Sequence, residues 1–147
     1  MPPLARRYLK TAFAFGILGV LTGMHMSSAL HLQLGSMHRW YLSAHTHIML
    51  VGFAMLAANS LALCLLPEAP GGSRHRPGLD KLAYWLITLC TLGRFSFEAA
   101  IGYMSPEPGW MHQTINAVAT LQGLGLIVFW VNQWPRINGH NVSEPPA

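Results

Sequence analysis

Four long apolar stretches divide the chain, and short polar segments separate them. The apolar stretches cover residues 11–30, 45–66, 82–103 and 111–131. Each is close to the roughly 20 residues that a helix needs to cross about 30 Å of hydrocarbon. The segments between them, "QLGSMHRW", "PEAPGGSRHRPGLDK" and "MSPEPGW", are rich in turn-forming residues. The pattern predicts an all-α integral membrane protein. It has a single four-helix transmembrane domain over residues 1–136 and a polar, disordered tail over residues 137–147.

The composition supports a membrane protein. Of the 147 residues, 52% are hydrophobic and only 10% are charged, whereas about 25% of the residues in a soluble domain are charged. Such a chain cannot cover a water-facing surface of ordinary composition, so we expect the lipid bilayer to surround it. The formal net charge of +4 is explained by the flanks of the spans, and no patch suited to nucleic acid is present.

The lysines and arginines predict the orientation, because cytoplasmic loops of membrane proteins are enriched in them. Almost all of these residues lie before the first span, between the second and third spans, or after the fourth: Arg6, Arg7, Lys10, Arg74, Arg76, Lys81 and Arg136. The other two connections carry only Arg39. We therefore expect both termini in the cytoplasm and a multi-pass protein of the bacterial inner membrane.

Several ionisable side chains fall near the predicted outer face. Counting about 1.5 Å per helical residue from the cytoplasmic end places four of them roughly 21 to 31 Å along their spans: His25, Glu98, His112 and His45. Ionisable groups inside a membrane are costly and normally face the bundle interior. Their shared depth predicts a site, although Arg94 and Glu98 could also neutralise each other as an i, i+4 pair.

His45 and His47 lie two residues apart, so on a regular helix their side chains point about 200° away from each other. The face of His45 continues through Met49, Gly52, Leu56 and Asn59. The face of His47 continues through Val51, Ala54, Ala58 and Leu61, which are all apolar. We therefore expect one of the two to face the bundle and the other to face lipid headgroups or a neighbouring helix, and we favour His45 as the inward ligand. Gly52 would let a flat macrocycle or another helix approach closely.

The stretch "AHTHIMLVGFAMLAANSLALCLLP" resembles the second helix of the catalytic subunit of heme-copper oxidases and the related nitric-oxide reductases. The pattern His-x-His-x-Met-x-x-Gly-Phe is also similar to the NnrS membrane proteins, which carry heme and copper. The resemblance implies that His45 binds heme b. A second ligand would come from His25, His112, or His47 of another protomer, with Arg39 near a propionate and Glu98 near the heme edge.

The chain has no counterpart of the family's later helices, which hold the opposing axial histidine, the copper ligands and the redox tyrosine. We therefore expect no complete binuclear centre here. The sequence favours a small heme b protein for respiratory electron transfer or for handling oxygen or nitric oxide. It would be an oxidoreductase component, as a homodimer or as a subunit of a respiratory complex.

The alternative is a copper-binding or assembly protein of a respiratory oxidase. Methionines are frequent in the predicted outer half: Met24, Met26, Met37, Met49, Met104 and Met111. With His25, His45 and His112 as metal ligands they would form a soft nitrogen and sulfur set that suits Cu(I). Methionine also fills gaps in apolar cores, so a bundle that only supports a partner subunit is a third possibility.

The first testable prediction concerns orientation. Reporter fusions after residue 72 and at the C-terminus should report the cytoplasm, and a fusion near Gly35 should report the periplasm, because the basic residues flank the former positions. Alkaline phosphatase and fluorescent-protein fusions measure this directly. A periplasmic signal at residue 72 would invert the orientation.

Overall fold

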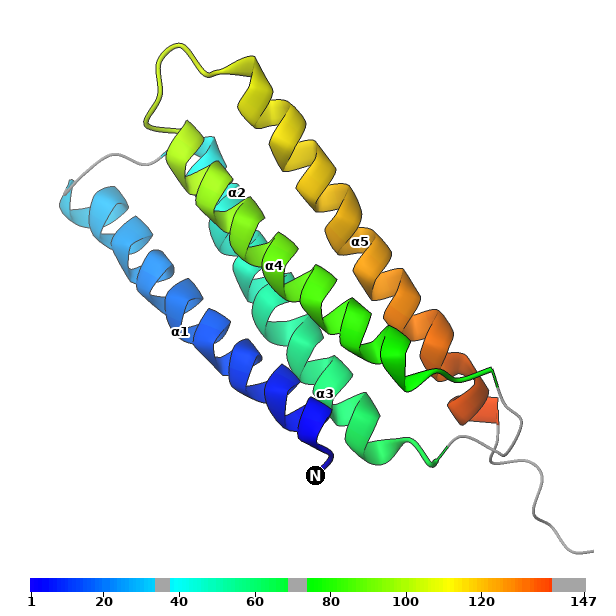
Figure 1. Cartoon of the computed structure of the whole chain (residues 1–147). Helices are drawn as coiled ribbons and strands as arrows, with labels where there is room; N and C mark the ends of the chain where they lie inside the picture. Colours follow the sequence, from blue (N-terminus) through cyan, green and yellow to red (C-terminus); the bar gives the residue numbers. More distant parts are fainter. Residues whose placement is uncertain (34–37, 69–73, 139–147) are drawn as a thin grey trace, which may run out of the picture.

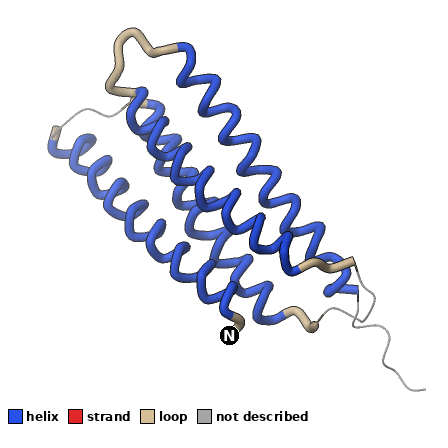
Figure 2. The backbone as a smooth tube through the Cα atoms, in the orientation of Figure 1, coloured by secondary structure: helices blue, strands red, loops and turns tan. Residues whose placement is uncertain are grey.

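The computed structural model describes residues 1–33, 38–68 and 74–138, and this part of the chain is all-helical (Figures 1 and 2). The elements are α1 (Pro3–Leu32), α2 (Arg39–His47), the π-helix η1 (Ile48–Met55), α3 (Leu56–Leu65), α4 (Pro77–Ile101) and α5 (Gly109–Asn138). Because α2, η1 and α3 follow one another without a break, they form one continuous rod, here called the α2–α3 rod. The bundle thus has four long helical members, as the apolar pattern predicts.

The helices are longer than the apolar stretches from which they were predicted. α1 begins at Pro3 and the rod begins at Arg39, because polar residues continue both helices beyond the apolar stretch. His45 and His47 therefore lie about two turns inside a helix. α5 continues to Asn138, so the predicted tail begins as helix, and its residues 139–147 lie outside the described part.

Three helices of the described part are long and apolar enough to cross a membrane: α1, the α2–α3 rod and α5. α4 has a suitable length but is more polar, since its 25 residues include Asp80, Lys81, Arg94 and Glu98. It lies between the rod and α5 (Figure 1).

Local signals explain where several helices begin and end. Proline stands in the first turn of α1 and of α4, at Pro3 and Pro77, where its missing N–H costs nothing and its fixed φ suits a helix. α1 ends at Gln33, which has a φ of 57° and donates its N–H to the Ser28 carbonyl. The ring of His38 caps α2, because its Nδ1 accepts a hydrogen bond from the Tyr41 N–H at 3.2 Å.

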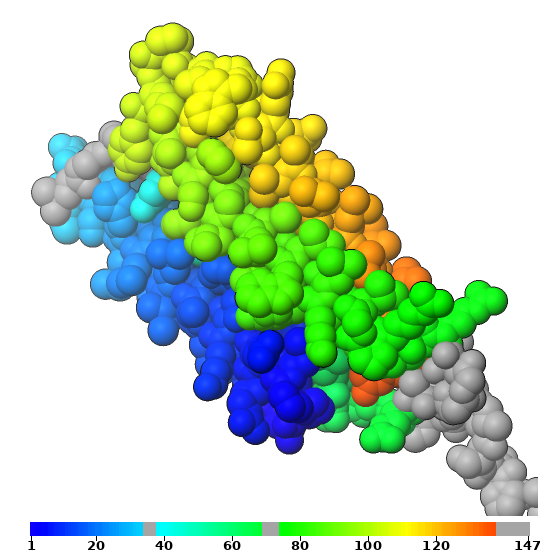
Figure 3. Space-filling view, in the orientation of Figure 1, coloured from blue at the N-terminus to red at the C-terminus, as the bar shows by residue number. Residues whose placement is uncertain are grey.

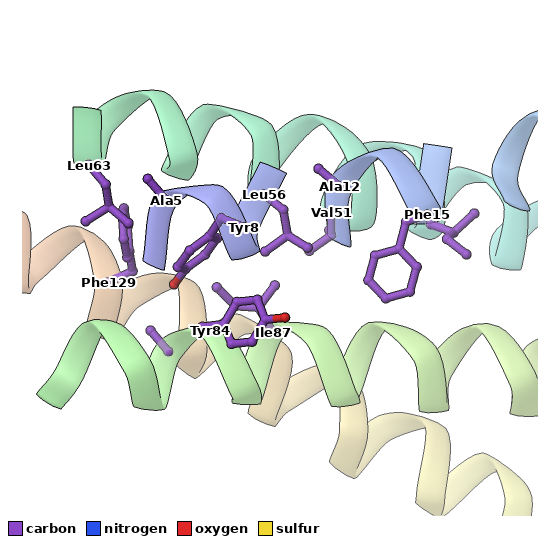
Figure 4. Close-up of a cluster of buried hydrophobic side chains, with 12 residues drawn as sticks. Ala5, Tyr8, Ala12, Phe15, Val51, Leu56, Leu63, Tyr84, Ile87 and Phe129 are labelled. Atoms are coloured by element: carbon purple, nitrogen blue, oxygen red, sulfur yellow. The ribbon is translucent and has the colours of Figure 1, made fainter. Parts of the chain in front are cut away.

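The main hydrophobic core lies in the half of the bundle that contains the N-terminus (Figure 4). All helical members contribute buried side chains to it, among them Tyr8, Leu56, Ile87 and Phe129. α1 and α4 also lie side by side here (Figure 3), and the Tyr8 hydroxyl donates to the Asp80 carbonyl at 3.1 Å. Large apolar side chains also cover the outer faces of α1 and α5, as expected for surfaces that contact lipid.

Three glycines of α1 form a close contact with the rod, here called the glycine seam: Gly16, Gly19 and Gly23. The side chains of Phe53, Met49 and His45 pack on them in that order. A Cβ added to Gly23 would lie 3.1 Å from His45 Cε1, and one added to Gly19 would overlap the Met49 sulfur. The small residues thus let two membrane helices approach closely.

Gly52 lies in the π-helix at a point where two neighbouring helices reach the rod. It is buried, and an added Cβ would lie 2.9 Å from Phe15 Cδ2 and 3.0 Å from Thr91 Cγ2. Of the two expected uses of Gly52, the close approach of another helix is therefore the one observed, because Phe15 of α1 and Thr91 of α4 fill the space beside it.

Replacing Gly52 by alanine should destabilise the bundle by about 1–3 kcal/mol, the usual cost of overpacking a core. The matched control is Gly123→Ala in α5, where an added Cβ meets nothing within 4 Å; it should be neutral or slightly stabilising, since alanine favours helix. Thermal unfolding of both variants in mild detergent measures the difference. Equal melting temperatures would contradict the packing described for Gly52.

Candidate functional site

Glu98 of α4 is the centre of a polar cluster between α4 and α2, here called the Glu98 cluster. Its side chain is only 1% exposed. The Oε1 atom accepts hydrogen bonds from Arg94 Nε at 2.9 Å and from Ser43 Oγ at 3.0 Å. His47 Nδ1 lies 3.6 Å from the other oxygen, Oε2. The Arg94–Glu98 pair is thus both an ion pair within α4 and part of a contact with α2.

Burial determines the chemistry of this cluster. A carboxylate removed from water is stable only when donors and an opposite charge replace its hydration. Arg94 provides the charge and Ser43 a second donor, but Glu98 Oε2 has no hydrogen bond within the described residues. Among the described residues, the cluster therefore has one carboxylate oxygen without a hydrogen-bond donor, and the His47 ring lies beside it.

Of the two surroundings expected for His47, lipid headgroups or a neighbouring helix, the neighbouring helix is the one observed. Its side chain is 28% exposed and points to Glu98, and its Nδ1 lies 2.8 Å from the Ser43 carbonyl oxygen. The reason is that the rod lies between α1 and α4, so that two opposite faces both meet protein. Beyond the two histidines, the face that continues from His45 is buried as expected, at Gly52, Leu56 and Asn59. The face that continues from His47 is exposed at Ala54, Ala58 and Leu61, but Val51 on that face is buried.

His45 lies on the opposite side of the rod, against Gly23 of the glycine seam. Its ring is half-buried, and Nδ1 is buried without a hydrogen-bond partner among the residues the structure describes. A buried polar atom without a partner is rare in folded proteins and needs a physical explanation. His45 is therefore the predicted ligand that has an unused nitrogen.

His25 of α1 is exposed and lies beside Tyr41, with ring centroids 5.3 Å apart. Tyr41 in turn meets His38, whose ring lies 5.2 Å from that of Tyr103. Burial holds the pKa of His38 below its usual range, although nearby Glu107 acts in the opposite direction. A neutral His38 is consistent with its role as an acceptor at the start of α2.

His112 and Arg39 belong to a separate contact around Glu107, in the connection between α4 and α5. Glu107 accepts from Trp40 Nε1 at 3.0 Å and lies 3.2 Å from His112 Nε2. Arg39 is 78% exposed and only 3.8 Å from the same carboxylate. These contacts hold the α4–α5 connection against the start of α2. The Arg39 side chain itself is turned toward solvent.

The predicted site residues therefore share one end of the bundle, but they divide into separate contacts. His45 meets the glycine seam, His47 meets Glu98, His25 meets Tyr41 and His112 meets Glu107. No group of three or more His, Cys, Asp or Glu side chains in the described ranges could hold a metal ion. In particular, His25, His45 and His112 do not form such a group.

A second buried carboxylate, Asp80, lies at the opposite end of α4. It is 3% exposed and accepts from Asn132 Nδ2 at 2.7 Å and Gln133 Nε2 at 2.6 Å, with His75 Nε2 at 3.1 Å. Arg136 extends this network, since it donates to the Gln133 side chain and to the Leu66 carbonyl. The network joins α3, α4 and α5.

Sequence reasoning missed Ser43 and this second network. Ser43 precedes His47 by one helical turn. That i, i+4 spacing puts both residues on one helix face, so it could have indicated that both contact the Glu98 carboxylate. The spacing of Asp80 from Asn132 and Gln133, more than 50 residues, contains no such local signal. Only the packing of α4 on α5 brings these three residues together.

Comparison with protein-family models, with curated proteins and with solved structures found no match for this chain. The resemblance to heme-copper oxidases and nitric-oxide reductases thus stays a prediction from the sequence.

The Glu98 cluster makes a testable prediction about stability. Arg94→Leu should cost about 3–5 kcal/mol, because it leaves a buried carboxylate without its counter-charge. Arg94→Leu combined with Glu98→Leu should cost clearly less than Arg94→Leu alone, since no buried charge then remains. Unfolding of the purified protein by SDS in mixed micelles measures both values.

Ser96→Ala is the control, because Ser96 is exposed on the same helix and bonds only to the Leu92 carbonyl. It should leave stability nearly unchanged. If the costs of the two single Leu substitutions simply add in the double variant, Arg94 and Glu98 are not energetically coupled.

Proposed function

We propose that the protein is a multi-pass protein of the bacterial inner membrane whose four helical members, α4 included, all cross the bilayer with both termini in the cytoplasm. The three apolar helices and the basic residues at one end support this arrangement. The polar character of α4 is compatible with it. Glu98 and Asp80 are buried against the rod and α5, so their carboxylates are shielded from lipid.

Within that membrane we propose that the protein binds heme b through His45. The observation that carries the proposal is the buried Nδ1 of His45, which has no partner within the described residues. A ring nitrogen that the chain does not bond is available to an iron or to a group held with it. His47 is the other candidate, because its Nδ1 lies close to the Ser43 carbonyl and to Glu98, an arrangement that leaves its Nε2 for a metal.

The surroundings of His45 are compatible with a flat apolar group on the lipid side. An apolar groove of about 540 Å³ follows the same contact between α1 and η1, lined by Phe13, Gly16, Ile17, Val20, Leu21, Met49 and Phe53. Met49 stands one helical turn below His45. The groove falls within the size range of pockets that hold small-molecule ligands.

Heme b would supply one-electron transfer, or gas binding at an open axial position, depending on whether one or two imidazoles hold it. The chain's own contribution would be to orient His45 on Gly23 and to exclude water with Met49 and Phe53. These roles fit respiratory electron transfer or the handling of oxygen or nitric oxide. The copper alternative would rest on methionine sulfurs together with histidines, since the described His, Cys, Asp and Glu side chains alone form no group of three that could hold a metal ion.

The test is the absorption spectrum of protein purified from membranes in mild detergent. It should show an intense Soret band and, after reduction, the sharp visible bands of a b-type heme. His45→Ala should lower the ratio of heme to protein by at least about tenfold, because even a hydrogen-bond partner of a metal ligand is worth that much.

His47→Gln is the matched control. It keeps a polar side chain beside Glu98 and should preserve the spectrum. Loss of heme in His47→Gln with retention in His45→Ala would reverse the ligand assignment. A colourless protein with near-stoichiometric copper, lost when Met49 is changed, would replace the heme proposal by the copper one.

A further inference from the structure

A second groove lies at the other end of the bundle, between the start of α4 and the second half of α5. Its volume is about 510 Å³. Apolar side chains form most of its lining, including Leu79, Ile127, Val128 and Val131, and Trp134 borders it. Val131 and Trp134 are exposed, so the groove opens toward the lipid.

One cation distinguishes this groove from an ordinary lipid-facing surface. Arg74 lines it, is exposed, and forms no ion pair with a carboxylate of the described residues. Asp80, in the first turns of α4, is buried and already bonded by His75, Asn132 and Gln133. The positive charge of Arg74 is therefore available to a ligand.

Two further exposed cations lie close to Arg74 in the chain. Arg76 and Lys81 are exposed in and beside the first turns of α4. Trp134 lies at the same end, and tryptophan prefers the level of lipid headgroups, where its ring meets apolar chains and its N–H meets polar groups. The groove thus has an apolar body and a cationic end at the depth of the headgroups.

From this arrangement we propose that the groove binds an anionic phospholipid. The acyl chains lie along Ile127, Val128 and Val131, and the phosphate contacts Arg74. Basic pockets between transmembrane helices on the cytoplasmic side are known to hold such headgroups. A zwitterionic phospholipid with the same chains would fit the apolar body, but the ammonium group of its net-neutral headgroup would weaken the attraction to this basic end.

Native mass spectrometry of the full-length protein, released from nanodiscs of phosphatidylglycerol and phosphatidylcholine with identical chains, tests the proposal. The wild-type protein should retain phosphatidylglycerol preferentially. Arg74→Gln should reduce that preference about fivefold, the equivalent of the roughly 1 kcal/mol that one basic residue contributes at an anionic surface. Val131→Trp, which fills the groove, should reduce retention of both lipids.

Arg7→Gln is the matched control, because Arg7 is an exposed arginine in the first turns of α1, outside the groove. It should keep the preference. Equal loss in Arg7→Gln and Arg74→Gln would mean that the basic end attracts anionic lipid without a defined site, and would overturn the proposal. An unchanged preference in Arg74→Gln would overturn it too. Far-ultraviolet circular dichroism verifies that each variant is folded.

Discussion

The arrangement of the bundle depends on two carboxylates of α4 that are removed from water. A buried carboxylate must be surrounded by donors, and in a membrane those donors can come only from neighbouring helices or from the same helix. Glu98 obtains them from Arg94 and from Ser43 of α2, and Asp80 obtains two of them from Asn132 and Gln133 of α5. α4 therefore has to lie between the rod and α5, with one carboxylate near each end.

This constraint explains why the helix with both buried carboxylates lies between the rod and α5. α4 is the helix that falls short of the apolarity needed to cross a membrane by composition alone, whereas α1, the rod and α5 meet it. Its large apolar side chains, among them Trp85 and Leu89, are exposed, while its carboxylates are buried against the neighbouring helices. Its polar side chains become contacts between helices, as the bond from Gln122 Nε2 to Thr91 Oγ1 also illustrates.

Local periodicity predicted the helices but not their neighbours. The apolar runs identified all four helical members, because each run must be about as long as the hydrocarbon is thick. They could not indicate that the rod has protein on two opposite sides, so the sequence left open whether His47 meets lipid headgroups or a neighbouring helix; it lies beside Glu98 of α4. The hydrogen-bond partners of Asp80 could not be predicted from the sequence either, because only the packing of α4 on α5 brings them together.

The π-helix η1 accounts for another part of the difference between the helix faces expected from the sequence and those observed in the structure. Its i→i+5 hydrogen bonds widen the turn, so residues five apart come nearer to one face than a regular helix allows. Gly52, five residues after His47, is accordingly nearer to the direction of His47 than a regular helix would place it, and both Gly52 and Val51 are buried. The direction in which successive side chains of the rod point therefore shifts at η1, directly after the two histidines. The side chains of His45 and His47 point in opposite directions, and each contacts a neighbouring helix: His45 contacts α1 and His47 contacts α4. One imidazole lies beside a buried carboxylate, while the other lies on a glycine with a ring nitrogen that the described chain does not bond. That difference in surroundings is the observation on which the proposed ligand role of His45 rests.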